Sequence, residues 1–268
     1  MKRRRFLQQL TGSMAVTTLV SERMMPNTGL PQSRITGPLE LKSARQLFID
    51  DLFIAEGRGV RLVVNHPSPT GERCLIADKP WESFAILAYN SIMQDAGVLK
   101  LWYDTIANDG SRWCCYATSQ DGLHWEKPDL GIVAFNGRRD TNIVFPPERM
   151  THEPNCVFKD TNPSCPDTER YKMVANLHPP DGKMGTYVAA SADGLHWKLM
   201  EDSPAFRPSD TNNICFYDPS ISKYVGYVRV WDPMRKVGRC VFDDITNWGK
   251  EQVVFSYDED DERGLDGQ

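Results

Sequence analysis

The chain has 268 residues, of which 40% are hydrophobic and 25% are charged, and its net charge is −5. This composition is typical of a globular protein, and the acidic balance, with no basic stripe beyond the N-terminus, argues against a nucleic-acid partner. No segment has the uninterrupted apolar run of a transmembrane helix, so we expect no stable membrane insertion. The length fits one large β domain or two small ones.

Residues 1–30 are predicted to be an export signal and linker. The run Lys2-Arg3-Arg4-Arg5-Phe6-Leu7-Gln8 precedes a mildly apolar stretch from Leu10 to Val20. Paired arginines followed by Phe-Leu resemble the twin-arginine export signal of bacteria. The alternative is a disordered basic tail, because the apolar stretch is weak and shows no clear cleavage site. Export would place the protein in the periplasm or outside the cell.

The seven cysteines are an odd number, so at least one has no partner within the chain. Cys156 and Cys165 flank a loop and could pair, although nothing in the sequence requires it. Spacing typical of a zinc site is absent. The sequence therefore predicts no metal site.

A stretch in the middle of the chain occurs twice. Residues Tyr116 to Trp125 return as Val188 to Trp197, with the pattern Ser-x-Asp-Gly-Leu-His-Trp in both copies, 72 residues apart. A second pair follows, Asp140-Thr141-Asn142-Ile143 and Asp210-Thr211-Asn212-Asn213-Ile214, 70 residues apart. A weaker third copy spans Asp243 to Trp248. Two signals repeated in the same order indicate a repeated supersecondary unit.

Each unit is predicted to contain four antiparallel strands. Asp-Gly supplies a tight turn, and the Trp that follows is expected to return on a paired strand. The first unit has Ala85 to Met93, Val98 to Tyr103, Trp113 to Thr118 and a strand at Trp125; the second has Asn155 to Lys159, Tyr171 to Leu177, Thr186 to Ser191 and a strand from His196. The third has Asn213 to Tyr217, Tyr224 to Val230, Gly238 to Phe242 and a strand at Trp248.

Four antiparallel strands per repeat, with no helical period, indicate the blade of a β-propeller. The fold class is therefore all-β, with blades at about 82–137, 142–206 and 210–256 in a partial propeller over residues 31–268. A β-sandwich is the alternative. Three blades cannot close a ring, since propellers have about four to eight, so we expect a truncated product or fragment of a longer protein.

The Asp-Gly turns lie between the third and fourth strands, which directs the search for chemistry to the opposite end of the blades. Asp121 and Asp193 are expected to cap backbone N–H groups of their turns, while Trp125 and Trp197 pack between sheets. His124 then lies on the surface, as does His196 in the second copy. These motifs are interpreted as structural.

Three carboxylates at the blade entrances are the candidate catalytic residues: Glu82, Glu153 and Asp210. Carboxylates that converge on a channel with exposed Trp suit sugar chemistry, in which paired acids protonate the glycosidic oxygen and activate water or attack. Each position also has a structural interpretation, as a loop residue or an ion pair. The candidate substrate-binding residues are Trp81, Asp104, Asn155, His178, Asn213, Arg229, Trp231 and Asp232.

The chain resembles the five-bladed propeller glycosidase superfamily of invertase-like and arabinanase-like enzymes. The resemblance spans about residues 45 to 250 and implies three carboxylates around a sugar. The matching segments are Phe48-Ile49-Asp50-Asp51, Pro80-Trp81-Glu82, Leu101-Trp102-Tyr103, Tyr116 to Trp125, Arg170-Tyr171-Lys172 and Tyr227-Val228-Arg229. The Trp-Met-Asn-Asp-Pro, Arg-Asp-Pro and Glu-Cys motifs of invertases are absent, so the location of the site is carried over and the individual roles are not.

Three hypotheses follow. The first is an exported glycoside hydrolase acting on an oligo- or polysaccharide, and the second is a non-catalytic carbohydrate-binding propeller. The third is an inactive fragment of a longer hydrolase. Some propeller glycosidases hold a central calcium ion, but no ligand set in this sequence requires one, so no cofactor is predicted. The sequence does not indicate the sugar, the linkage or the oligomeric state.

Overall fold

The computed structural model describes residues 53, 54, 56, 58, 59, 63, 65–145, 151–179, 182–209, 211–258 and 261, with backbone alone at 151–155. The predicted export signal, the motif Phe48–Asp51 and Asp210 lie outside the described residues. The chain divides into two compact units, Met1–Thr70 and Gly71–Gln268, and all named strands belong to the second. No helix in the described residues has the length and hydropathy to cross a membrane.

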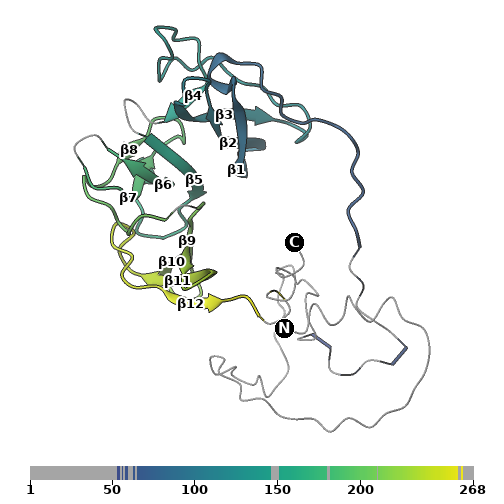
Figure 1. Cartoon of the computed structure of the whole chain (residues 1–268), viewed down its shortest axis with the longest axis vertical. Coiled ribbons are helices and arrows are strands. Elements are labelled where there is room, and N and C mark those ends of the chain that lie inside the picture. Colours follow the sequence, from purple (N-terminus) through teal and green to yellow (C-terminus); the bar gives the residue numbers. More distant parts are fainter. Residues whose placement is uncertain are drawn as a thin grey trace. The chain divides into compact units, whose positions relative to one another are not determined.

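Three four-stranded antiparallel sheets follow one another along the chain, which confirms the all-β fold with blade-like units (Figure 1). In each sheet the strands pair in chain order, as in a propeller blade. The first sheet has β1 (Ala85–Asp95), β2 (Val98–Ile106), β3 (Arg112–Ser119) and β4 (Ile143–Phe145); the second has β5 (Thr151–Lys159), β6 (Tyr171–His178), β7 (Gly185–Ser191) and β8 (Lys198–Leu199). The third has β9 (Ile214–Asp218), β10 (Lys223–Trp231), β11 (Arg235–Phe242) and β12 (Gln252–Phe255).

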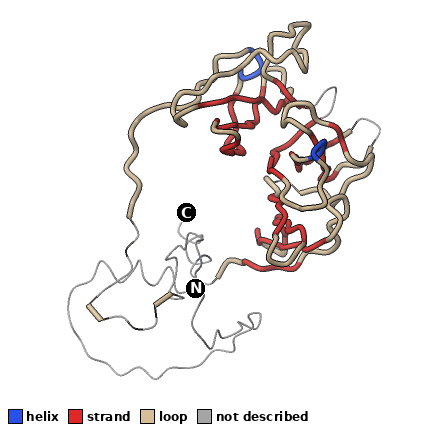
Figure 2. The backbone as a smooth tube through the Cα atoms, turned by 180° about the vertical axis from the view of Figure 1, so that it is seen from behind, coloured by secondary structure: helices blue, strands red, loops and turns tan. Residues whose placement is uncertain are grey.

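The helical elements between the described strands are two 3-10 turns, η1 (Pro80–Glu82) and η2 (Asp167–Glu169) (Figure 2). Pro80 opens η1, where the fixed φ of proline suits the first helical position. The chain enters β1 three residues after this turn. The turn therefore sets how the chain enters the first sheet.

The fourth strands begin later than predicted. The strand expected at Trp125 is β4, at Ile143–Phe145, and only one bridge, between Thr118 and Glu126, forms near the tryptophan. The physical reason is that the turn continues through Trp125, whose Nε1 donates to the carbonyl oxygen of Gly122 at 3.1 Å. The strands expected from His196 and at Trp248 likewise correspond to β8 and β12.

The second repeated signal occupies two different places in the topology. Asn142 and Ile143 lead into β4, the outer strand of the first sheet, whereas Asn213 and Ile214 lead into β9, the first strand of the third sheet. Only the Ser-x-Asp-Gly signal therefore marks equivalent positions in two blades.

The Ser-x-Asp-Gly turns have the predicted structural role. The Oδ1 atom of Asp121 accepts hydrogen bonds from the backbone N–H groups of Leu123 and His124, both at 2.8 Å. Asp193 makes the same two bonds, at 2.8 and 2.9 Å. The backbone N–H of His124 is the main cause that lowers the pKa of Asp121, so this cap is an ionised carboxylate.

The first and second sheets meet at Trp102, which is fully buried. Its Nε1 donates to the carbonyl oxygen of Gly194 at 2.7 Å, and its ring centroid lies 6.1 Å from that of Tyr171. The carbonyl oxygen of Gly194 corresponds to that of Gly122 in the first turn, which accepts a hydrogen bond from Trp125. As a result, the buried Nε1 of Trp197 has no hydrogen-bond partner in the described part of the chain.

A tyrosine–aspartate bond joins each sheet to the next. The hydroxyl of Tyr171 on β6 donates to Asp95 at the end of β1, and the hydroxyl of Tyr224 on β10 donates to Asp160 after β5 at 2.7 Å. Lys100 also bonds Asp95, at 2.7 Å, and is the main cause that lowers the pKa of Asp95. Because the folded-state pKa is lowered, this contribution to stability is present above the unfolded-state pKa and is lost on acidification.

Two apolar clusters fill the spaces between successive sheets, and a third covers the far face of the first sheet. The third cluster packs Trp81 of η1 and Phe135 of the β3–β4 connection against β2 and β3. The corresponding far face of the third sheet is uncovered in the described residues. It carries the exposed side chains of Ile214, Phe216 and Val241.

We expect Gly194→Ala to destabilise the fold more than Gly122→Ala. Both glycines have φ near +80°, where alanine costs about 1–2 kcal/mol. A Cβ at Gly194 would also lie 2.7 Å from the Trp102 ring, adding about 1–3 kcal/mol of overpacking. At Gly122 the nearest atom would be 3.4 Å away, on Leu99. Urea unfolding measures the difference, and equal losses would show that the second turn does not hold the first sheet.

Candidate active site

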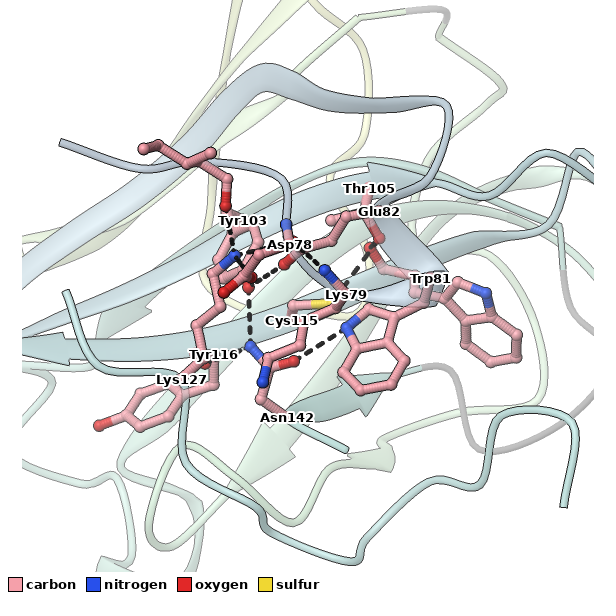
Figure 3. Close-up of polar contacts among 12 residues, drawn as sticks. Asp78, Lys79, Trp81, Glu82, Tyr103, Thr105, Cys115, Tyr116, Lys127 and Asn142 are labelled. Carbon is pink, nitrogen blue, oxygen red and sulfur yellow. Dashed lines mark hydrogen bonds and ion pairs between the residues drawn. The ribbon is translucent and has the colours of Figure 1, made fainter. Parts of the chain in front are cut away.

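Glu82 is a buried structural carboxylate (Figure 3). Its Oε2 atom accepts from Nζ of Lys127 at 2.7 Å and from the backbone N–H groups of Asp78 and Lys79 at 2.9 and 3.2 Å. Its Oε1 atom accepts from the hydroxyl of Tyr103 at 2.7 Å. Four donors around a carboxylate that is 1% exposed leave no access for a sugar, so the catalytic role predicted for Glu82 does not fit this geometry.

Trp81 is buried in the same cluster and offers no surface for stacking a sugar. Its Nε1 donates to Oδ1 of Asn142 at 2.9 Å, and Nδ2 of Asn142 donates to the Tyr103 hydroxyl at 2.7 Å. Burial, followed by the proximity of Cys115 and Glu82, raises the pKa of Tyr103. The hydroxyl is therefore a fixed donor within the first sheet, and the predicted substrate contact by Trp81 does not fit either.

Asp104, Asn176 and Arg229 occupy the same position in the three second strands. Asn176 follows Asp104 by the 72 residues that separate the two Asp-Gly turns, and each of the three lies in β2, β6 or β10 opposite the third strand. In the first two sheets the register with the first strand shifts at this point. The shifts fall between Ile86 and Asn90 and between His152 and Asn155.

Asn176 fastens the residues on both sides of Asp210. Its Nδ2 donates to the carbonyl oxygen of Ser209 and, at 3.1 Å, to that of Thr211. Its Oδ1 accepts from the hydroxyl of Thr186 at 2.8 Å and from Nδ2 of Asn213 at 3.3 Å. Asn176 and Asn213 are both buried, so this amide network holds the connection from the second sheet to β9.

Asn176 also lies opposite the β5 irregularity that contains Glu153. Irregularities of this kind re-aim side chains and are frequent beside active sites. The side chains of Glu153 and Asn155 lie outside the description, and so does Asp210. The backbone positions nevertheless bring the surroundings of Glu153 and of Asp210 to the same buried amide.

Three buried polar atoms near this amide have no hydrogen-bond partner within the described residues. They are Oγ of Ser209, Oδ1 of Asn212 and Oδ1 of Asn213. Buried polar atoms are normally paired, so a group of unpaired ones requires an explanation such as water or a ligand. The group marks this entrance as a place where polar ligand atoms can be accommodated.

The remaining predicted residues are dispersed. Asp104 is buried, and His178 is exposed at the end of β6. Trp231 ends β10 with 54% of its surface exposed, and the guanidinium carbons of Arg229 and Arg235 lie 5.8 and 5.2 Å from its ring centroid. Asp232 is exposed and accepts from Nζ of Lys236 at 3.4 Å. Burial removes Asp104 from contact with a substrate, whereas the Trp231 group is accessible.

No group of three or more His, Cys, Asp or Glu side chains in the described residues could hold a metal ion. All seven cysteines are free thiols, including Cys156 and Cys165. Burial raises the pKa of Cys115 and of Cys215, so both remain protonated, unreactive thiols at neutral pH.

No family model matches the sequence. Among curated proteins, the chain is similar to an uncharacterized protein of Mycobacterium tuberculosis, with 28% identity over 120 residues. The match covers 42% of this chain and 34% of that protein, so the chain spans about a third of the relative's length. The activity and partners of a whole protein are accordingly proposals for this chain.

Among solved structures, the chain is similar to a candidate glycoside hydrolase of Parabacteroides distasonis, with 19% identity and a TM-score of 0.49 over 70% of this chain and 62% of that one. A thermostable family-43 glycoside hydrolase matches at 14% identity and a TM-score of 0.44, over 64% and 54%. An endo-arabinase of Bacteroides thetaiotaomicron matches at 11% identity and a TM-score of 0.43, over 65% and 57%.

We expect Glu82→Gln to cost about 3–5 kcal/mol of stability, because it leaves the ammonium group of Lys127 buried without its carboxylate partner. Asp78→Asn is the matched control: Asp78 also pairs with Lys127 at 2.7 Å, but its side chain is 62% exposed, so about 1 kcal/mol or less is expected. Chemical denaturation measures both. A Glu82→Gln protein as stable as wild type would return Glu82 to the list of catalytic candidates.

Proposed function

We propose that the chain belongs to a glycoside hydrolase that acts on an oligo- or polysaccharide through Glu153 and Asp210. Glycoside hydrolysis needs two carboxyl groups that flank the scissile bond, one as acid and the other as base or nucleophile. Glu153 is the third residue of β5, and Asp210 precedes β9 by four residues in the sequence, near the blade entrances at which the resemblance implies carboxylates. Glu82, the third candidate carboxylate, is left out of the proposal because it is buried in an ion pair with Lys127.

The observation that carries the proposal is the set of hydrogen bonds made by Asn176. Its amide holds Ser209 and Thr211, which flank Asp210, and it lies opposite the irregular part of β5 that contains Glu153. A buried amide with fixed partners is the kind of support that positions a catalytic carboxylate before substrate binds.

The second candidate function is carbohydrate binding without turnover. The exposed ring of Trp231 favours it, because an aromatic face presents apolar surface with a polar surround. This function predicts binding of a polysaccharide that Trp231→Ala abolishes, with no release of sugar by the wild-type protein. Release of sugar by the wild-type chain would exclude it.

We expect Glu153→Gln and Asp210→Asn each to abolish sugar release, assayed on a panel of neutral and acidic polysaccharides. Asn176→Ala is expected to lower kcat by about 10²-fold with KM nearly unchanged, because it acts through the position of a carboxylate. Asn176→Asp keeps the acceptor for Thr186 and Asn213 but loses the donor to the carbonyl oxygens of Ser209 and Thr211, so it should not restore kcat. Asp232→Asn is the control, since Asp232 is exposed outside this network. Wild-type rates in either carboxylate variant would remove that residue from the mechanism.

Export by the twin-arginine route is part of the proposal. It rests on Arg4, Arg5 and the Phe-Leu that follows them. A reporter enzyme fused behind residues 1–30 should reach the bacterial periplasm, and Arg4→Lys with Arg5→Lys should retain it in the cytoplasm. Export that is insensitive to both substitutions would contradict the assignment.

A further inference from the structure

A groove of about 600 Å³ lies where the second and third sheets meet, apart from the Asn176 network. Its walls come from the β6–β7 connection, the segment after β8 and the segment before β12. The volume is within the range of about 300–1,000 Å³ that is usual for small-molecule sites. The residues that give it its chemistry are Lys183, Met184, Phe206, Arg207, Lys250 and Glu251.

The groove is positively charged although the chain as a whole carries −5. Three cationic side chains, those of Lys183, Arg207 and Lys250, line it together with one carboxylate, Glu251. Local potential of the sign opposite to the net charge concentrates ligands of the complementary sign. The groove therefore favours an anionic ligand.

Arg207 is held in place and already neutralised. Its Nη2 donates to Oε1 of Glu251 at 2.5 Å, and its guanidinium carbon lies 5.0 Å from the centroid of the Phe206 ring. Burial acts to raise the pKa of Glu251, but the hydrogen bond from Arg207, a backbone hydrogen bond and the charges of Arg207 and Lys250 together outweigh it, so the pKa lies below its usual value. The cations left for a ligand are the ammonium groups of Lys183 and Lys250, which have no ion-pair partner among the described residues.

Arg207 also contacts the backbone of the third sheet. Arg207 Nη2 also donates to the carbonyl oxygen of Arg229 on β10, at 3.3 Å. The side chains of Arg229 and Arg235 both lie beside the ring of Trp231. Trp231 follows Arg229 by two residues on β10, and Arg235 is the first residue of β11. The bond to the Arg229 carbonyl fixes Arg207 against β10, whereas Trp231 and its two arginines are not among the residues that line the groove.

We propose that this groove binds an anionic polysaccharide, whose carboxylate or sulfate groups contact Lys183 and Lys250. The inference rests on the proposed function, because it specifies the class of polysaccharide that the hydrolase recognises. A sugar polymer supplies apolar ring faces for Met184 and Phe206, which line the groove, and regularly spaced anions for the two lysines. Neutral polysaccharides lack the second interaction.

The test is affinity electrophoresis of the full chain in gels that contain polygalacturonate, dextran sulfate or neutral arabinan. We expect retardation by an anionic polymer that weakens as salt is raised, since exposed charges are screened. Lys183→Gln with Lys250→Gln should raise the Kd about tenfold or more. Retardation by polygalacturonate alone would identify carboxylate as the group that the site binds, and retardation by dextran sulfate alone would identify sulfate. Retardation by both polymers would indicate a site that binds either anion.

The matched control removes two cations elsewhere. Lys198 is exposed on β8, and Lys223 lies at the opposite end of β10 from the groove, so Lys198→Gln with Lys223→Gln changes the net charge equally. Near-UV circular dichroism verifies that both double variants are folded. Equal losses of affinity in the two double variants would overturn the proposed site, as would equal retardation by double-stranded DNA.

The neutral polymer distinguishes a failure of the anionic-ligand inference from a failure of the proposed glycoside hydrolase function. Binding or cleavage of arabinan without any effect of the anionic polymers would refute the inference and leave the glycoside hydrolase assignment standing. No interaction with any polysaccharide, and no release of sugar from any, would refute both. Retardation by the anionic polymers that is lost only in the Lys183 and Lys250 double variant supports both.

Discussion

The contact between successive sheets is the constraint on which the rest of this structure depends. A single four-stranded sheet cannot bury both of its faces, so each blade needs a neighbour. The chain repeats one device for this purpose, a tyrosine hydroxyl on the second strand that donates to an aspartate at the first turn of the previous sheet. Trp102 adds a direct bond to the turn of the next sheet at Gly194.

One strand position shows how the same backbone site acquires different chemistry. Asp104 is buried in the first sheet, Asn176 binds the connection to the third sheet, and Arg229 lies beside an exposed tryptophan. The difference arises from what covers the position. In the first and second sheets a following sheet covers this position, so Asp104 and Asn176 are buried. In the described residues no sheet covers the corresponding face of the third sheet. Repetition of the fold therefore does not imply repetition of function.

Glu82 illustrates the limit of assigning chemistry to a carboxylate from its place in the chain. It stands at a blade entrance, next to a tryptophan, as a catalytic acid would. Lys127, 45 residues further on, neutralises it, and Tyr103 and two backbone N–H groups complete its hydrogen bonds. A buried ion pair and an active-site carboxylate use the same residue types. They differ in burial and in partners from distant segments, which spacing along the chain does not encode.

The sequence by itself determined the all-β fold, the four-stranded repeat and the structural role of the Asp-Gly turns. These depend on local chemistry: turn residues, strand periodicity and a 72-residue repeat. That repeat could also have pointed to Asn176, as the counterpart of Asp104. Tertiary structure alone decided that Glu82 and Trp81 are core residues, that β4 begins at Ile143 rather than at Trp125, and that Asn176 reaches both sides of position 210. Each of those outcomes depends on contacts between segments that are far apart in the sequence, and tertiary packing determines those contacts.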